Sequence, residues 1–382
     1  MEKIKLVLEK YGFEPLETPA IEYAETLKGK YGEEEKLIYE FEDRGGRAVA
    51  LRYDQTVPLA RVVAQYQDLP KPFKRYQIQP VWRAENPQKG RFREFLQVDF
   101  DTVGAKSLLA DAEVIAAASD TLKEIGFKEF TIKINDRAVF QDLPPAAISS
   151  IDKLKKIGED GVFLELQNKG FKIGEARRVL DQVKQNTTTE SINKLFQYLD
   201  QLGISQEVYA FDPSLARGLD YYTGSIFEIE VDGYSAGSVG GGGRYDELIG
   251  IFSKESIPAV GFSFGFDRLV EAAKELNLIP EAESKTKVLV TIFDENAGKQ
   301  SLQLTSLLRN SGVNTECFLD TESKLEKQIK YADNKGIPFV AILGPEEIEK
   351  GVVTLKDLRS GKQEQLKQTD LIKKLQLISL TV

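Results

Sequence analysis

Histidine is missing altogether from the 382 residues of this chain, and cysteine occurs only at position 317. Without histidine, no imidazole of the protein can act as a general base, a nucleophile or a metal ligand. A single cysteine excludes disulfides within the chain and zinc sites built from several cysteines. Catalysis must therefore rest on arginine, lysine, carboxylates, tyrosine, backbone groups or a bound ion, and a magnesium ion held by carboxylates is still allowed.

Long apolar runs are also missing. No stretch approaches the roughly 20 apolar residues that a membrane-spanning helix needs, and the charges spread over residues 1–10 exclude a signal-peptide core there. The composition, 41% hydrophobic and 29% charged, is typical of a soluble globular protein. The length allows two or three domains. We therefore expect a cytoplasmic protein with no membrane partner.

Acidic residues outnumber basic ones, and the net charge of −9 argues against a protein that coats nucleic acid. One segment departs from this balance. Between positions 71 and 93 every charged residue except Glu85 is basic: Lys71, Lys74, Arg75, Arg83, Lys89, Arg91 and Arg93. A basic segment on an acidic body suits an enzyme that grips phosphates in one place. A chance fluctuation in a charged chain is the alternative.

The same segment has the pattern of a β-hairpin. Residues 73–82 are rich in aromatic and β-branched side chains, and residues 91–101 alternate between polar and apolar side chains, as in a half-buried strand. The polar face of the second strand carries Arg91, Arg93, Phe95, Gln97, Asp99 and Asp101. We expect this face to be exposed. It suits a ligand with phosphates at one end, a flat base in the middle and a cation at the other, although a mixed-charge surface strand is the alternative.

Four segments carry a resemblance to a known family. Arg83 to Gln97 resembles motif 2 of the class II aminoacyl-tRNA synthetases, and its continuation to Asp101 resembles the histidyl-tRNA synthetase family. Leu215 to Gly224, which reads Leu-Ala-Arg-Gly-Leu-Asp-Tyr-Tyr-Thr-Gly, is similar to a signature of that family. Residues 260–269 resemble motif 3. Residues 12–20 resemble the later part of motif 1, which forms the dimer interface in the family.

The resemblance implies two groups of site residues. Those for histidine are Asp54, Gln55, Thr56, Gln97, Asp101, Arg217, Tyr221 and Tyr222. Asp54 to Thr56 would hold the α-amino group, and Gln97, Asp101 and Tyr222 would hydrogen-bond the imidazole. Taken without the resemblance, Asp54 to Thr56 also fits a plain strand end with an Asp turn.

Those for ATP are Arg83, Glu85, Arg91, Phe95 and Arg268. Arg83 and Arg217 would flank the α-phosphate as the catalytic residues. Phe95 and Arg268 would lie on opposite faces of the adenine base. Magnesium would sit on the outer phosphates, and no residue is assigned to it.

A glycine-rich run at 237–246 invites a phosphate-loop interpretation. It lacks the Gly-Lys-Ser/Thr ending of a P-loop and does not fit Gly-x-Gly-x-x-Gly before a helix. Glycines in a strand also allow the backbone to approach a ligand closely. In the family, the same Gly-Gly-Arg-Tyr-Asp sequence lines the histidine pocket.

The implied fold is α+β. A class II antiparallel-sheet catalytic domain would comprise residues 1–137 and 206–279, with a helical insertion at 138–205. Residues 37–41 and 48–53 read as a hairpin of short strands. From 287 to 382 strands alternate with helices, which is typical of a separate α/β domain, and this part resembles the family's anticodon-binding domain. Lys324, Lys327 and Lys330 form one helix face there, either solvated or in contact with tRNA.

The implied activity is ATP-dependent ligation of L-histidine to tRNA(His) through histidyl-adenylate, by a homodimer. Two alternatives stay open. One is a non-catalytic histidine-binding paralogue, such as the regulatory subunit of ATP phosphoribosyltransferase, which generally lacks the C-terminal domain. The other is a tRNA-binding module that has lost its activity.

Overall fold

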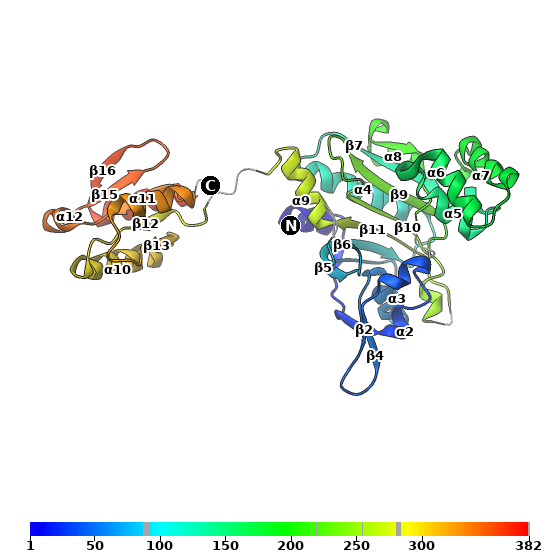
Figure 1. Ribbon diagram of the computed structural model, residues 1–382, viewed down its shortest axis with the longest axis horizontal. Coiled ribbons are helices and arrows are strands. Elements are labelled where there is room, and N and C mark those ends of the chain that lie inside the picture. Colours follow the sequence, from blue (N-terminus) through cyan, green and yellow to red (C-terminus); the bar gives the residue numbers. More distant parts are fainter. Residues whose placement is uncertain (87–91, 218–220, 254, 280–283, 381–382) are drawn as a thin grey trace. The chain divides into compact units, whose positions relative to one another are not determined.

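The computed structural model describes residues 1–86, 92–217, 221–253, 255–279 and 284–380. The chain divides into two compact units, Met1–Leu278 and Ile279–Val382, and Figure 1 draws both. An 8-stranded sheet organises the first unit and a 5-stranded sheet organises the second. The predicted α+β class is confirmed. None of the described helices combines the length and apolar character that crossing a membrane requires.

The large sheet brings together strands that are far apart in the sequence. Its order is β1 (Glu14–Pro15), β5 (Phe73–Trp82), β6 (Glu94–Val103), β11 (Ala259–Gly265), β10 (Gly240–Arg244), β9 (Ser225–Val231), β7 (Phe130–Asp136) and β8 (Tyr209–Phe211). All neighbours pair antiparallel except the two edge strands, β1 and β8. The predicted hairpin therefore lies directly beside β11, which carries the motif 3 segment.

Helices close one face of this sheet. The long helix α4 (Leu108–Ile125) begins at Ser107, whose side chain accepts a hydrogen bond from the N–H of Leu109, and ends at Gly126 in the left-handed region. It packs against α1 (Glu2–Lys10), α8 (Glu190–Gln201) and β11, as Figure 1 shows. The apolar side chains of β6, including Val98 and Phe100, are fully buried in the core on this side.

The prediction of an antiparallel β5–β6 hairpin is confirmed, but the expected exposure of its polar face is wrong. Gln97, Asp99 and Asp101 are only 8%, 2% and 2% exposed, whereas Phe92, assigned to the apolar face, is 52% exposed. The carboxylates are covered because polar side chains such as Tyr245 pack against them. Alternation identified which residues share a face, but this face lines a cavity rather than meeting bulk water.

A second, small sheet precedes the hairpin. It consists of β2 (Ile21–Tyr23), β4 (Ala48–Leu51) and β3 (Glu40–Glu42), and the helices α2 (Ala24–Leu27) and α3 (Thr56–Gln65) accompany it. The predicted pairing of two short strands is confirmed, but the first does not begin at residue 37. Residues up to Leu37 form the 3-10 helix η1 (Gly32–Leu37). The Glu35 carboxylate accepts the N–H of Lys30 at 2.9 Å, which favours a turn before η1.

The helices between β7 and β8 belong to two different cores. The elements η2 (Arg137–Phe140), α5 (Pro145–Ile151), α6 (Leu154–Asn168) and α7 (Ile173–Gln185) share a core of their own. Helix α8 instead packs on α4 and buries its apolar side chains in the core of the large sheet. Lys155 of α6 joins the two parts through ion pairs with Asp212 at 3.0 Å and Glu230 at 3.1 Å.

Short elements complete the first unit: η3 (Gln206–Val208), η4 (Ile249–Ile251) and α9 (Phe266–Glu275). The second unit has the sheet order β13 (Thr315–Cys317), β12 (Val288–Val290), β14 (Phe339–Ile342), β15 (Val353–Asp357) and β16 (Gln363–Leu366). Its helices are α10 (Glu295–Asn310), α11 (Leu325–Asn334), α12 (Pro345–Lys350) and α13 (Gln368–Leu380). Parallel pairing of β12 with β13 and β14 fits the predicted alternation of strands and helices.

A buried ion pair ties the glycine-rich strand to helix α4. Arg244 of β10 pairs with Asp111 of α4, and the two residues are 5% and 0% exposed. The Ser225 hydroxyl also donates to Asp111, and Arg244 donates to the carbonyls of Ala105 and Ser107. Arg244 of the Gly-Gly-Arg-Tyr-Asp sequence therefore has a structural role here.

We predict that Asp111→Ala lowers the free energy of unfolding by about 3–5 kcal/mol, because it removes the buried partner of Arg244 and leaves only the 35% exposed Asp246, at 3.1 Å, to pair with it. Glu113→Ala is the matched control on the same helix. Glu113 pairs with Lys74 at 2.6 Å, but its side chain is 33% exposed, so the expected loss is within about 1 kcal/mol. Urea unfolding followed by circular dichroism measures both. Equal losses in the two variants would contradict the prediction.

Candidate functional site

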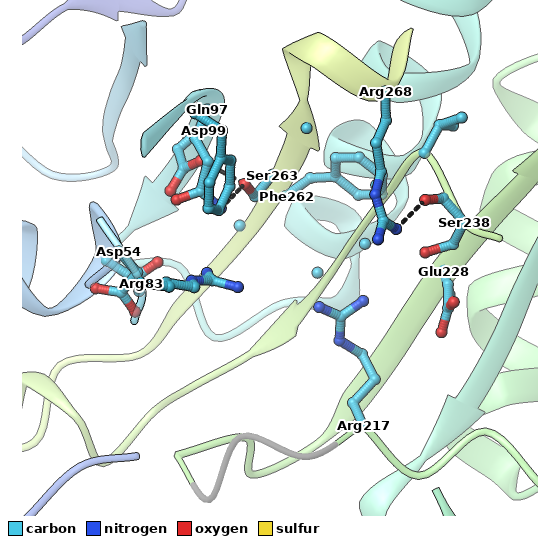
Figure 2. A pocket seen from close by; sticks show the side chains of 18 of the residues that line it. Asp54, Arg83, Gln97, Asp99, Arg217, Glu228, Ser238, Phe262, Ser263 and Arg268 are labelled. Carbon is cyan, nitrogen blue, oxygen red and sulfur yellow. Dashed lines mark hydrogen bonds between the residues drawn. The ribbon is translucent and has the colours of Figure 1, made fainter. Parts of the chain in front are cut away.

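A cavity of about 300 Å³ lies against the polar face of the large sheet and is shown in Figure 2. Its lining includes most of the residues singled out from the sequence: Asp54, Thr56, Arg83, Glu85, Phe95, Gln97, Asp101, Arg217, Tyr221, Tyr222 and Arg268. Residues from five separate stretches of the chain thus meet at one place. Arg91 lies outside the described residues.

Gln55 is not brought to the cavity. Its side chain is fully buried, and its Nε2 donates to the backbone carbonyl of Gln79 on β5 at 2.7 Å. The side chain is therefore hydrogen-bonded to β5 of the hairpin and does not line the cavity. Its neighbours Asp54 and Thr56 do line the cavity.

Arg83 is held rigidly at the end of β5. Its N–H donates to the carbonyl of Arg93 at 2.9 Å, and its Nε donates to the carbonyl of Tyr53 at 3.2 Å. The guanidinium lies 4.3 Å from the centre of the Tyr53 ring and 5.1 Å from that of Phe95. Burial would lower the pKa of Arg83, but Tyr53 and Glu34 raise it. The cavity thus contains a fixed and permanent cation.

Asp54 is a buried carboxylate at the start of α3. Its Oδ1 accepts the Tyr31 hydroxyl at 2.9 Å and the N–H of Val57 at 3.0 Å, and its Oδ2 accepts the Tyr221 hydroxyl at 3.3 Å. Burial raises the pKa of Asp54, and these donors oppose the shift. A carboxylate oriented in this way can bind an ammonium group through charge-assisted hydrogen bonds.

Arg217 enters the cavity from the opposite side. Its φ of +50° lies in the left-handed region, which is strained for a residue with a long side chain. Its Nη1 donates to the carbonyl of Phe227 at 3.3 Å, and the guanidinium lies 5.6 Å from the Tyr222 ring centre. A Cβ at Gly241 would approach Nη1 to 1.6 Å. Only glycine at position 241 leaves room for this arginine.

The polar end of the cavity is formed by β6 and its neighbours. Gln97 Nε2 donates to the Ser263 hydroxyl at 3.0 Å. Asp101 forms an ion pair with Arg75 at 2.8 Å and accepts the Tyr245 hydroxyl at 2.5 Å. The Oε1 atom of Gln97 is buried without a hydrogen-bond partner in the described structure, and such an atom is suited to accept a hydrogen bond from a ligand.

Arg268 closes the site at the first turn of α9. Its Nη1 donates to the carbonyl of Ser238 at 2.8 Å, as Figure 2 shows. The preceding residue, Asp267, accepts the N–H of Leu96 at 2.9 Å and so ties α9 to β6. Three arginines, Arg83, Arg217 and Arg268, therefore extend into one cavity from different elements.

The cavity also contains residues to which the sequence patterns gave no role: Glu34, Asp99, Asp152, Glu228, Ser238 and Ser263. The alternation of β6 could have found Asp99, since it lies between Gln97 and Asp101 on the same face. Glu34 comes from a 3-10 helix and Asp152 from the end of α5, and neither stands in a recognisable motif.

Comparisons with known proteins agree with this geometry. The family model described as histidyl-tRNA synthetase matches residues 1–159 and 159–269. A histidine–tRNA ligase of Cytophaga hutchinsonii is 38% identical, covering 98% of this chain and 94% of its own length. One of Gloeobacter violaceus is 40% identical, covering 96% and 92% respectively. The chain belongs to the histidyl-tRNA synthetase family. Membership makes it an enzyme, an aminoacyl-tRNA synthetase.

Solved structures of the family match almost the whole chain. The histidyl-tRNA synthetase from Nostoc has a TM-score of 0.76 at 33% identity and covers 98% of this chain and 94% of its own. An ATP phosphoribosyltransferase regulatory subunit/histidyl-tRNA synthetase from Bacillus halodurans has a TM-score of 0.67 at 22% identity, covering 89% and 92%. The second likeness concerns the fold alone. Residues 287–377 match the model of an anticodon binding domain.

We predict that Gly241→Ala lowers aminoacylation by about 10²–10³-fold, because the added methyl group displaces the Arg217 guanidinium from its place in the cavity. Gly174→Ala in α7 is the matched control, since a Cβ there meets nothing within 4 Å, and it should leave the rate unchanged. Initial rates of tRNA charging measure both. A Gly241→Ala enzyme with normal rates would show that Arg217 needs no such clearance.

Proposed function

We propose that this enzyme joins L-histidine to tRNA(His) in two steps. In the first, the histidine carboxylate attacks the α-phosphate of ATP, which gives histidyl-adenylate and releases pyrophosphate. In the second, a ribose hydroxyl at the tRNA end attacks the adenylate carbonyl and AMP leaves. The observation that supports this most directly is the convergence of Arg83 and Arg217 on one cavity with Asp54 and Gln97.

The first step needs no general base, because a carboxylate is already a nucleophile. It needs correct positioning of the two reactants and neutralisation of the charge that develops on phosphorus. Arg83 is fixed between two aromatic rings and Arg217 by the carbonyl of Phe227, so neither must reorganise during reaction. This assigns the α-phosphate to the space between their guanidinium groups.

The adenine base is assigned to the space between Phe95 and Arg268. Both residues line the cavity, and an aromatic ring and a guanidinium plane can stack on opposite faces of a base. Glu85 also lines the cavity and completes the ATP site that the motifs imply.

Magnesium is expected to enter with ATP. Among the described residues, no three acidic side chains converge to form a site for a metal ion. This fits an ion carried mainly by the phosphates and water, which is the usual state of magnesium bound with nucleotides. When bound, it would neutralise charge on the outer phosphates.

Histidine is assigned to the polar end. Asp54 and Thr56 would receive its ammonium group, with Tyr221 fixing the Asp54 carboxylate. Gln97 and Asp101 would bind the imidazole beside Tyr222. A site built from buried polar groups rejects substrates that lack the matching groups by roughly 10⁴–10⁵, which would provide the specificity for histidine.

A homodimer in the cytoplasm is part of this proposal, by analogy with the family. Large apolar side chains on α1 and β2 support the dimer. Leu6, Ile21 and Tyr23 are 56%, 51% and 49% exposed, and exposed apolar side chains of this size are available for association with a second copy.

A non-catalytic histidine-binding paralogue is the alternative from another class. Two features favour the enzyme: Arg83, Arg217 and Arg268 share one cavity, and the C-terminal unit matches an anticodon binding domain. A histidine-binding regulator of this kind generally lacks the C-terminal domain.

We predict that the protein charges tRNA(His) with histidine and that Arg217→Ala lowers histidine-dependent pyrophosphate exchange by at least about 10²–10³-fold, because one preorganised cation is lost. Arg47→Ala, on an exposed turn of the small sheet, is the control and should keep normal activity. Circular dichroism checks that both variants fold. Histidine binding without any charging by the unaltered protein would favour the regulator instead.

We predict that Asp101→Ala raises the KM for histidine by about 10–100-fold, the expected cost of losing a hydrogen bond to a charged group, and spares the KM for ATP. Glu94→Ala on the same strand, where the side chain is exposed, should change neither. Pyrophosphate exchange at varied histidine and varied ATP separates the two constants. An equal rise in both would place Asp101 outside the histidine site.

A further inference from the structure

Asp99 lies at the centre of the polar face of β6, between Gln97 and Asp101. It is 2% exposed and lines the cavity. The Ser263 hydroxyl donates to its Oδ1 at 2.5 Å, and Gln97 Nε2 donates to the same hydroxyl at 3.0 Å. Figure 2 shows Gln97, Asp99 and Ser263 together at this end of the cavity. These two hydrogen bonds fix the orientation of the Asp99 carboxyl group in the cavity.

The neighbouring Asp101 has different partners. Burial raises the pKa of Asp101, and the ion pair with Arg75 at 2.8 Å and the hydrogen bond from Tyr245 at 2.5 Å oppose that shift and favour the ionised carboxylate. An ionised carboxylate only accepts hydrogen bonds. In the proposed histidine site, Asp101 is therefore suited to accept one N–H of the imidazole ring.

Asp99 has no ion pair of its own among the described residues. Burial raises its pKa to about 7, and Arg75 and the Ser263 hydroxyl oppose the shift. The charged and titratable groups that act on Asp99 come from several elements: Arg75 of β5, Asp101 of β6, and Arg52, Asp54 and Tyr222 of the adjoining loops. Near neutrality this side chain can either donate or accept a hydrogen bond.

The imidazole ring of the substrate can likewise donate or accept a hydrogen bond at its second nitrogen, depending on its protonation state. A neutral imidazole has one N–H donor and one acceptor nitrogen, and an imidazolium has two donors. If Asp101 accepts one N–H, the second nitrogen requires a donor when the ring is neutral and an acceptor when it is charged. A protonated Asp99 fits the first case and an ionised Asp99 fits the second.

We propose that Asp99 is a further specificity-determining residue of this enzyme, which holds one proton jointly with the imidazole ring of histidine. Ser263 positions Asp99 for this role, and Gln97 positions Ser263. The inference rests on the proposed histidine site at the polar end of the cavity.

The joint proton makes histidine binding depend on pH in both directions. At low pH the free pair carries two protons, one on Asp99 and one on the ring, and binding must release one. At high pH the free pair carries none, and binding must take one up. The affinity for histidine is therefore highest at a pH near the pKa values of the two free groups, which are about 6.5 for the imidazole ring and about 7 for Asp99. It falls about tenfold per pH unit on each side.

The test measures the proton itself. Calorimetric titration of histidine at about pH 8, in buffers of different ionisation enthalpy, gives the number of protons taken up on binding. We expect about one for the unaltered enzyme, because both groups are then deprotonated before binding, and close to none for Asp99→Asn. The alkaline fall in affinity should also disappear in Asp99→Asn. Equal proton uptake by the two proteins would overturn the proposal.

Ser263→Ala is a second variant that keeps the proposal testable if Asp99→Asn does not fold. Loss of the hydroxyl that lowers the pKa of Asp99 should move the alkaline fall in affinity to higher pH. An unchanged pH profile would count against the joint proton. Asp101→Ala distinguishes failure of the proposed histidine site from failure of the inference about Asp99. If Asp101→Ala leaves the KM for histidine unchanged, the histidine site itself is misplaced. If it raises that KM while Asp99→Asn behaves as the unaltered enzyme, only the inference about Asp99 fails.

Discussion

The burial of charged side chains against both faces of the large sheet is the constraint on which this structure depends. Removing a carboxylate or a guanidinium from water is costly unless a partner compensates. Asp101 meets this requirement through Arg75, and Arg244 meets it through Asp111. The first pair joins the neighbouring strands β5 and β6 on the cavity face, and the second joins β10 to α4 on the opposite, helix-covered face. The two ion pairs therefore help to set the relative positions of β5, β6, β10 and α4 around the cavity.

The second requirement is that the Arg217 side chain can lie close to the backbone of β10. Strand β10 has glycine where Arg217 crosses it, since a Cβ at Gly241 would lie 1.6 Å from the guanidinium. Glycine in a strand interior weakens the strand and packs nothing. Here the cost is offset by pairing on both edges, with β9 and β11. A strand with little side-chain packing is thus stabilised by its central place in the sheet, and the space it leaves is filled by the Arg217 guanidinium.

The sequence was sufficient for the hairpin, the fold class and most of the residues that meet in the cavity, because each rests on a local pattern or a contiguous motif. It was insufficient wherever the answer depends on what covers a residue. Alternation gave Gln97 and Asp101 a common face but could not tell a solvated face from a buried one. The motif at Asp54 could not reveal that the Gln55 side chain bonds to the backbone of β5 and does not line the cavity. Glu34 and Asp152 come from segments without a motif, and only the folded chain brings them to the cavity.

In this chain without histidine, a buried carboxylate can change its protonation state near neutral pH. A side chain that changes its charge near neutrality is normally an imidazole, and this chain has none. Burial gives the same property to a carboxylate, because it destabilises the ionised form of Asp99. A carboxylate and an imidazole titrate in opposite charge senses, from neutral to negative and from positive to neutral. With one proton between them, a carboxylate and an imidazole have a net charge of zero wherever the proton lies. Two carboxylates that share one proton would be negative, and two imidazoles that share one would be positive. A protein that must recognise an imidazole in both of its forms is thus served better by a buried carboxylate than by a histidine of its own.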